Sequence, residues 1–234
     1  MVSRPLSSLY KVIIGFWFIF MANSAVFATS GSTAATGAEK STKPFQILAL
    51  GDSLTAGYGL EPGDGFVDQM QAYLDGQSLN QPVKITNAGV SGDTTSGGQA
   101  RLAWTLAGFG PKGPDLVTVA LGGNDGLRGI NPKVTRKNLT VIIKTLTDRK
   151  IPVFFIGMQA PPNLGGDYAR DFNSIYPDLA KQYQVPLYPF FLDGVAAVKD
   201  LNQSDGIHPN KKGVSIIISK MGPVLKKLLD QLQK

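Results

Sequence analysis

The sequence predicts an α/β fold, a three-layer α/β/α sandwich around a parallel sheet of about five strands. Short runs rich in β-branched and aromatic residues alternate along the chain with longer segments of helical periodicity. Such alternation implies right-handed crossover connections and a parallel sheet that is covered by helices on both faces. The chain has 234 residues, of which 43% are hydrophobic, so it can form one sizeable core.

The expected strands are five apolar runs, the last with a weaker signal: 45–50, 83–88, 115–121, 152–157 and 185–190. The helix-like segments lie between and after them: about 65–76, 94–107, 133–149, 168–184 and 211–233. In the third of these helices the apolar residues share one face: Leu139, Ile142, Ile143 and Leu146. Pro223 predicts a kink in the last helix, because proline removes a backbone donor and fixes φ.

The N-terminal residues precede the predicted domain. Arg4 and Lys11 come before an apolar run that ends in small residues near Ala28, which is typical of a cleaved signal peptide over 1–28. The unbroken apolar run is shorter than the roughly 20 residues of a membrane-spanning helix. Residues 29–43 are small and polar and predict a disordered leader, which leaves 44–234 as the folded domain. We therefore expect a periplasmic or secreted protein with no stable membrane span after signal cleavage.

Composition excludes several classes of function. The chain has no cysteine, which rules out disulfides, cysteine-based zinc sites and a thiol nucleophile. Its single histidine argues further against a zinc site. The formal net charge of +6 is spread over scattered lysines with no basic and aromatic stripe, so we expect no nucleic acid partner. Pro62 stands where a dinucleotide-binding loop would need its third glycine, and no P-loop pattern is present.

The loops that follow the predicted strands carry most of the polar chemistry. In open parallel sheets the site forms outside the carboxyl ends of the strands. Glycine, serine, asparagine, aspartate and histidine gather in five such loops: GDSL at 51–54, NAGVSGDT at 87–94, LGGND at 121–125, MQAPPNLGGDY at 158–168 and SDGIHPN at 204–210.

A serine, a histidine and an aspartate in these loops fit nucleophilic catalysis. If Ser53 is a nucleophile activated by imidazole, His208 must be its base, because the chain has no other histidine. Asp205 precedes His208 by three residues, and a short turn would let its carboxylate accept the Nδ1 proton and leave Nε2 for the serine.

Two further residues offer hydrogen-bond donors for an oxyanion. Gly92 can present its backbone N–H to a ligand at close range, and the Asn124 amide donates two hydrogen bonds and cannot ionise. Together with the backbone N–H of Ser53, at the start of a helical turn, they would form an oxyanion hole.

Each of these residues also has an ordinary structural interpretation. Asp52 or Ser53 fits a helix N-cap, Gly92 a plain turn, and His208 a loop histidine without catalytic work. A carboxylate-rich metal site that uses Asp52, Asp205 and His208 is a weaker alternative. The G-x-S-x-G elbow is absent around Ser53, which argues against the α/β-hydrolase fold. The appearance of these residues in order, each after a different strand, favours serine catalysis.

These loops resemble the four sequence blocks of the SGNH, or GDSL, hydrolase family. The matching blocks are GDSL at 51–54, Gly92 within SGDT, Asn124 within GGND, and Asp205 and His208 within DGIHPN. The segments LGGNDGLRG and IYPDLAKQYQVPLYPFF further resemble the bacterial thioesterase I/protease I/lysophospholipase branch, which includes arylesterases.

The resemblance implies a flavodoxin-like α/β/α fold and a serine esterase that needs no metal and no organic cofactor. It implies Ser53 as nucleophile, His208 as base and Asp205 as its orienting acid, with Ser53, Gly92 and Asn124 as the oxyanion hole. The expected substrates are short-to-medium acyl or aryl esters, with lysophospholipids and acyl thioesters as further small-molecule or lipid substrates. A carbohydrate O-acetylesterase on the same triad and a non-catalytic ligand-binding module stay open as alternatives.

Apolar residues near these loops are the candidates for substrate contact. Leu54, Pro161 and Leu164, with Leu127, are placed by the sequence close to the predicted site, where they would line an acyl or aryl pocket.

Overall fold

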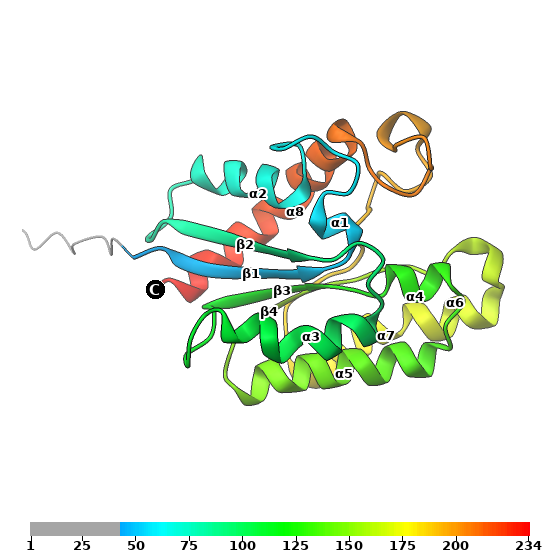
Figure 1. Ribbon diagram of the computed structural model, residues 1–234, viewed down its shortest axis with the longest axis horizontal. Coiled ribbons are helices and arrows are strands. Elements are labelled where there is room, and N and C mark those ends of the chain that lie inside the picture. Colours follow the sequence, from blue (N-terminus) through cyan, green and yellow to red (C-terminus); the bar gives the residue numbers. More distant parts are fainter. Residues whose placement is uncertain (1–42) are drawn as a thin grey trace, which may run out of the picture. The chain divides into compact units, whose positions relative to one another are not determined.

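The computed structural model describes residues 43–234 and contains one five-stranded parallel sheet (Figure 1). The order of the strands is β2-β1-β3-β4-β5. Their bounds are β1 Phe45–Gly51, β2 Val83–Gly89, β3 Leu116–Ala120, β4 Val153–Ile156 and β5 Leu187–Tyr188. All adjacent pairs are parallel, which confirms the predicted α/β fold with its five-stranded parallel sheet.

Helices lie on both faces of the sheet, as the alternating pattern predicts. In Figure 1, α2 (Phe66–Asp75) and α8 (Lys211–Leu232) lie on one side, and α3 (Thr95–Ala107) and α5 (Pro132–Asp148) lie on the other. Within each layer α2 packs against α8 and α3 against α5. The remaining helical elements are α1 Ser53–Ala56, α4 Gly123–Leu127, η1 Pro162–Leu164, α6 Gly166–Asn173, α7 Ile175–Tyr183 and η2 Lys199–Leu201.

The helices differ from the sequence expectation in one place. The segment expected as one helix over 168–184 is two, since α6 ends and α7 begins on either side of Ser174. Pro223 lies inside α8, which runs from Lys211 to Leu232 as one helix, and the kink expected there stays a prediction. Met221 and Leu225 are buried on either side of the proline, and this packing outweighs the one missing hydrogen bond.

The core is built on the two central strands. Ile47, Leu48 and Leu50 on β1 and Val117 and Val119 on β3 have no exposed surface. Both strands are nearly continuous apolar runs, interrupted by Gln46 and Thr118, because helices cover both faces of the sheet. The polar loops that carry the candidate site begin where these two buried strands end, at Gly51 and Ala120.

The predicted signal peptide over 1–28 and nearly all of the predicted leader over 29–43 lie outside the described residues. Within residues 43–234, no helix combines the length and the apolar composition needed to cross a membrane.

Candidate active site

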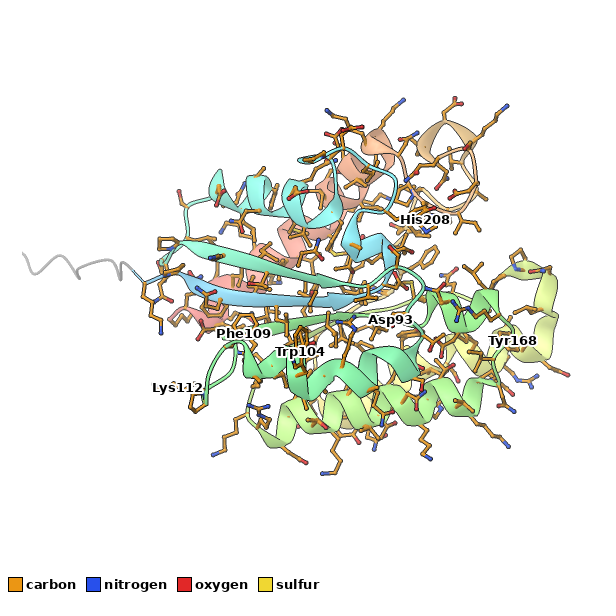
Figure 2. The ribbon with its side chains drawn as sticks, in the orientation of Figure 1. Asp93, Trp104, Phe109, Lys112, Tyr168 and His208 are labelled. Carbon is orange, nitrogen blue, oxygen red and sulfur yellow. The ribbon has the colours of Figure 1, made fainter. Side chains whose placement is uncertain are left out.

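Loops from β1, β2, β3 and the β5–α8 connection meet at the carboxyl edge of the sheet. Figure 2 shows Asp93 and His208 at this end, while Trp104 and Phe109 lie toward the opposite end. The chain thus collects residues that are far apart in sequence at the place where an open parallel sheet offers a crevice.

Ser53 is the first residue of the short helix α1, directly after β1. The N-cap of α1 is Asp52, whose Oδ1 accepts a hydrogen bond from the backbone N–H of Leu54 at 3.0 Å. The alternative that Ser53 itself serves as the cap is therefore wrong. Its hydroxyl is available for another partner, and its backbone N–H lies in the first turn, where a helix offers no internal acceptor.

The partner of Ser53 is His208. Nε2 of His208 lies 2.8 Å from Ser53 Oγ, and Nδ1 lies 2.6 Å from Asp205 Oδ2. These distances join the three side chains in one hydrogen-bonded series with the imidazole in the middle. In such a series the carboxylate holds the imidazole tautomer and leaves Nε2 to accept the hydroxyl proton.

The backbone of the β5–α8 connection fixes this arrangement. Oδ1 of Asp205 accepts hydrogen bonds from the backbone N–H groups of Ile207 at 2.9 Å and His208 at 3.0 Å. Gly206, which follows Asp205 directly, has φ +71°. Left-handed φ values favour glycine, so Gly206 allows the tight turn that brings the carboxylate back to the imidazole. The ring of Tyr58 covers one side of His208, with 4.7 Å between the ring centroids.

The two aspartates near Ser53 are shifted in opposite directions. Desolvation raises the pKa of Asp205, but hydrogen bonds from the backbone and ring of His208 and from Ile207 outweigh it and lower the pKa to about 2. Burial raises the pKa of Asp52 to about 6, against the opposing effect of the Leu54 N–H. Asp205 is thus the carboxylate that is ionised and hydrogen-bonded to the imidazole, whereas Asp52 is a buried cap.

The candidate oxyanion donors Gly92 and Asn124 are linked through Asp93, but not all the candidate donors line the cavity. Asn124, in the first turn of α4, donates from Nδ2 to the backbone carbonyl of Asp93 at 3.0 Å. Gly92 is the neighbour of Asp93, with φ +82°, and its carbonyl accepts from Arg128 Nη2 at 2.8 Å. Ser53 and Asn124 line the cavity described next, and Gly92 is not among its lining residues.

A cavity of about 540 Å³ opens over Ser53 and His208. Its walls are mostly apolar, and they come from α1, α4, the loop after β4 and the β5–α8 connection. The apolar lining residues are Leu54, Leu127, Met158, Ala160, Pro161, Pro162, Phe190, Leu192, Ala196, Ala197 and Ile207. A cavity of this size and lining suits a small apolar acyl or aryl group beside the hydroxyl.

Of the expected substrate-contact residues, Leu54, Pro161 and Leu127 line this cavity, and Leu164 does not. Leu164 ends η1, and its side chain lies near Gly129 at the end of α4. Pro161 and Pro162 line the cavity, whereas Leu164, two and three positions further along the chain, does not, which sequence proximity alone does not reveal.

Asp125, next to Asn124, has a structural role that the sequence does not indicate. Asp125 is buried and accepts hydrogen bonds from Thr95 N at 2.8 Å, Thr95 Oγ1 at 2.5 Å and Thr135 Oγ1 at 3.0 Å. These bonds fasten α4 to the first turns of α3 and α5, so they hold the helix that carries Asn124. The signal in the sequence was a carboxylate between two glycine-rich turns, but its threonine partners are 10 and 30 positions away.

Comparison with known proteins places the chain in a family. Residues 49–216 match the profile of the GDSL-like Lipase/Acylhydrolase family. The chain is 38% identical over 183 residues to Esterase TesA of Pseudomonas aeruginosa, covering 78% of this chain and 89% of the relative. It is 40% identical over 164 residues to an Arylesterase of Vibrio mimicus, covering 70% and 80%.

Thioesterase 1/protease 1/lysophospholipase L1 of Escherichia coli K12 is 36% identical over 184 residues, covering 79% of this chain and 85% of that protein. Among solved structures, AlinE4, described as an SGNH-hydrolase family esterase, is 45% identical and covers 81% of this chain and 98% of its own, with a TM-score of 0.67. The chain belongs to the GDSL-like lipase/acylhydrolase family, the SGNH hydrolases.

Proposed function

We propose that the protein is a serine esterase that hydrolyses carboxylic esters through an acyl-enzyme on Ser53. The observation that carries the proposal is the hydrogen-bonded series from Ser53 Oγ through His208 to Asp205, of which Ser53 and His208 line a mostly apolar cavity. Family membership and the names of the relatives, which are esterases and an arylesterase, support the same reaction class.

In the first half-reaction Ser53 Oγ attacks the carbonyl carbon of the ester while His208 Nε2 accepts the hydroxyl proton. The carbonyl oxygen becomes an oxyanion, and the donors proposed to hold it are the N–H groups of Ser53 and Gly92 and the Asn124 amide. The tetrahedral intermediate collapses, the C–O bond to the leaving group breaks, and His208 passes its proton to the departing alcohol.

In the second half-reaction His208 takes a proton from water, which attacks the acyl-enzyme carbonyl. Collapse of this second intermediate releases the carboxylic acid and returns the proton to Ser53. Throughout, Asp205 keeps its negative charge, since its pKa near 2 lies far below neutral pH, and so stabilises the imidazolium formed in each half-reaction.

From the mostly apolar lining of the cavity, we propose neutral substrates with a compact apolar acyl or aryl group. Leu54, Leu127, Pro161 and Ile207 would contact that group. We extend the proposal to lysophospholipids and acyl thioesters because one of the relatives is named thioesterase and lysophospholipase. A carbohydrate O-acetylesterase would also use the triad, but the apolar walls favour an acyl or aryl ester over a sugar.

The experiment is steady-state hydrolysis of p-nitrophenyl esters from acetate to decanoate by the wild type and three variants. Ser53→Ala and His208→Ala should each lower kcat/KM by about 10⁴-fold or more, because the triad acts as a unit. Ser219→Ala, on the exposed face of α8, is the matched control and should leave kcat/KM unchanged.

Other outcomes of this panel separate the alternatives. Full activity in Ser53→Ala would refute the assignment of the nucleophile. Turnover of acetylated xylan with little turnover of p-nitrophenyl esters would support the O-acetylesterase. No turnover of any ester, together with saturable ligand binding, would support a binding module.

We also propose that residues 1–28 are removed as a signal peptide and that the enzyme acts in the periplasm or outside the cell. The support is the charged, apolar and small-residue order that ends at Ala28. Intact mass spectrometry of the exported chain should give a species that begins at Thr29 or within a few residues of it. Recovery of a chain that begins at Met1 from the membrane fraction would contradict export by cleavage.

A further inference from the structure

An ion pair at the carboxyl edge of the sheet takes no part in the proton relay. Nε of Arg101, on α3, lies 2.6 Å from Oδ2 of Asp93 in the loop between β2 and α3. The side chains are only 19% and 15% exposed, so the pair is largely shielded from solvent. Figure 2 shows Asp93 at the edge of the sheet that also carries His208.

Arg101 also holds the end of the nucleophile's strand. Its Nη2 donates to the backbone carbonyl of Gly51 at 2.8 Å, and Gly51 is the last residue of β1, two positions before Ser53. The planar guanidinium therefore bridges two segments, one that positions Ser53 and one that contains Gly92. A lysine ammonium lacks this fixed fork of donors.

Asp93 in turn orients the Asn124 amide. Its backbone carbonyl accepts one N–H of Asn124 Nδ2 at 3.0 Å. An asparagine amide nitrogen carries two hydrogens, so the second N–H stays available to a ligand in the cavity that Asn124 lines. The position of the Asp93 carbonyl decides where that second N–H points.

Backbone hydrogen bonds of the same loop join it to the Gly51 carbonyl that Arg101 binds and close its own turn. Val90 N donates to Gly51 O at 3.0 Å, and Asp93 N donates to Val90 O at 3.0 Å. Between Val90 and Asp93 the chain passes through exposed Gly92 in a left-handed conformation. The partly buried Arg101 thus binds the Asp93 end of this turn directly and shares the Gly51 carbonyl with the Val90 end.

We propose that Arg101 is a positioning residue for the oxyanion hole. It holds Asp93 against the end of β1, and through Asp93 it fixes the Asn124 amide and the Gly92 N–H relative to Ser53. This inference rests on the proposed esterase function, because it concerns donors to the oxyanion of that reaction.

The test is the kinetics of Arg101→Lys with p-nitrophenyl acetate. The variant keeps the charge and most of the length, but its donors all lie on one nitrogen and lack the fork by which Arg101 reaches Asp93 from Nε and Gly51 from Nη2. We expect kcat to fall about 10- to 100-fold with KM within about threefold of the wild type, because misplaced donors weaken binding of the transition state more than that of the substrate. An unchanged kcat would overturn the proposal.

A double-mutant cycle distinguishes positioning from general damage to the fold. Asp93→Asn keeps the carbonyl that binds Asn124 and removes the charge that Arg101 holds, so it should lower kcat in the same direction. The kcat of the double variant should be no lower than that of Arg101→Lys alone, because both changes break the same Arg101–Asp93 ion pair. If the losses in kcat of the two single variants multiply in the double variant, the proposal is overturned. If Arg101→Lys folds poorly, the kcat of Asp93→Asn alone still tests the proposal.

The matched control is Arg136→Lys. Arg136 pairs with Asp178 at 2.8 Å between α5 and α7, and neither residue lines the cavity. The same chemical change there should leave kcat and KM as in the wild type, and an equal loss of kcat would overturn a specific role for Arg101. A wild type without hydrolysis would refute the proposed function itself, whereas an active wild type with an equally active Arg101→Lys would refute only this inference.

Discussion

At the scale of single residues, Asp52 and Asp205 show how the surroundings of a carboxyl decide its role. Asp205 is partly exposed and accepts hydrogen bonds from two backbone N–H groups and the imidazole, and these favour its charged form. Asp52 is 1% exposed, and burial favours its neutral form. Asp52, next to Ser53, is therefore a poor choice for the acid of the proposed triad, and the distant Asp205 is a good one.

The raised pKa of Asp52 predicts a pH-dependent stability. The folded-state pKa of about 6 lies above the ordinary value of 3.8, so the folded state binds this proton more tightly than the unfolded state does. The free energy of unfolding should then fall as the pH rises from about 4 to about 6. Asp52→Asn keeps an oxygen acceptor for the Leu54 N–H and removes the titration.

Relative to Asp52→Asn, the wild type should lose about 2 kcal/mol of unfolding free energy between pH 4 and pH 7. Denaturant unfolding of both proteins at several pH values measures this difference. Parallel stability profiles for the two proteins across this range would contradict a buried carboxyl with a raised pKa.

At the scale of elements, the end of β2 and the backbone of α1 lie unusually close together. A Cβ on Gly89 would lie 2.7 Å from Ala56 Cα and 2.8 Å from Asp52 O, and it would meet Ala56 N at even shorter range. These are backbone atoms that cannot rotate away. Because of this close approach, α1, which carries Ser53, packs directly against the end of β2.

Gly89→Ala should therefore destabilise the protein by about 2 kcal/mol or more, since overpacking against backbone forces the chain to shift. It should also lower kcat, because α1 carries Ser53. Gly166→Ala is the matched control: a Cβ there meets nothing within 4 Å, and the residue begins α6. Thermal unfolding measures the stability of both variants, and equal stabilities of Gly89→Ala and Gly166→Ala would contradict the close packing of α1 against the end of β2.

The elements that the sequence predicted best are those with one dominant signal. The central strands are long apolar runs, and α5 has one apolar stripe, so their positions followed from periodicity. The break at Ser174 and the uninterrupted passage of α8 through Pro223 depend on tertiary packing, which outweighs local propensity.

The site was predictable to a similar degree. Ser53 and His208 were linked because the chain has one histidine, but the capping role of Asp52 needed the hydrogen bond to Leu54 N to be seen. Leu164 is not among the residues that line the cavity, although it ends the short η1 helix that follows Pro161, because closeness in sequence does not fix which way a side chain points. Arg101 and Asp125 act through partners that no spacing rule connects.

At the scale of the whole molecule, the strand order explains why the site forms where it does. From β1 the chain moves to β2 on one side and then crosses to β3 on the other side of β1. Connections that leave in opposite directions open a crevice at the carboxyl end of the strand between them. Ser53 follows that central strand, and the loops with Gly92 and Asn124 follow its two neighbours.

The central claim is that Ser53 is a nucleophile activated by His208, and covalent labelling tests it most directly. Intact mass spectrometry after treatment with a fluorophosphonate, followed by peptide mapping, measures both stoichiometry and position. We expect one adduct per chain, on Ser53, with none in Ser53→Ala and a strongly slowed reaction in His208→Ala. No adduct on the folded wild type, or an adduct that persists in Ser53→Ala, would contradict the account.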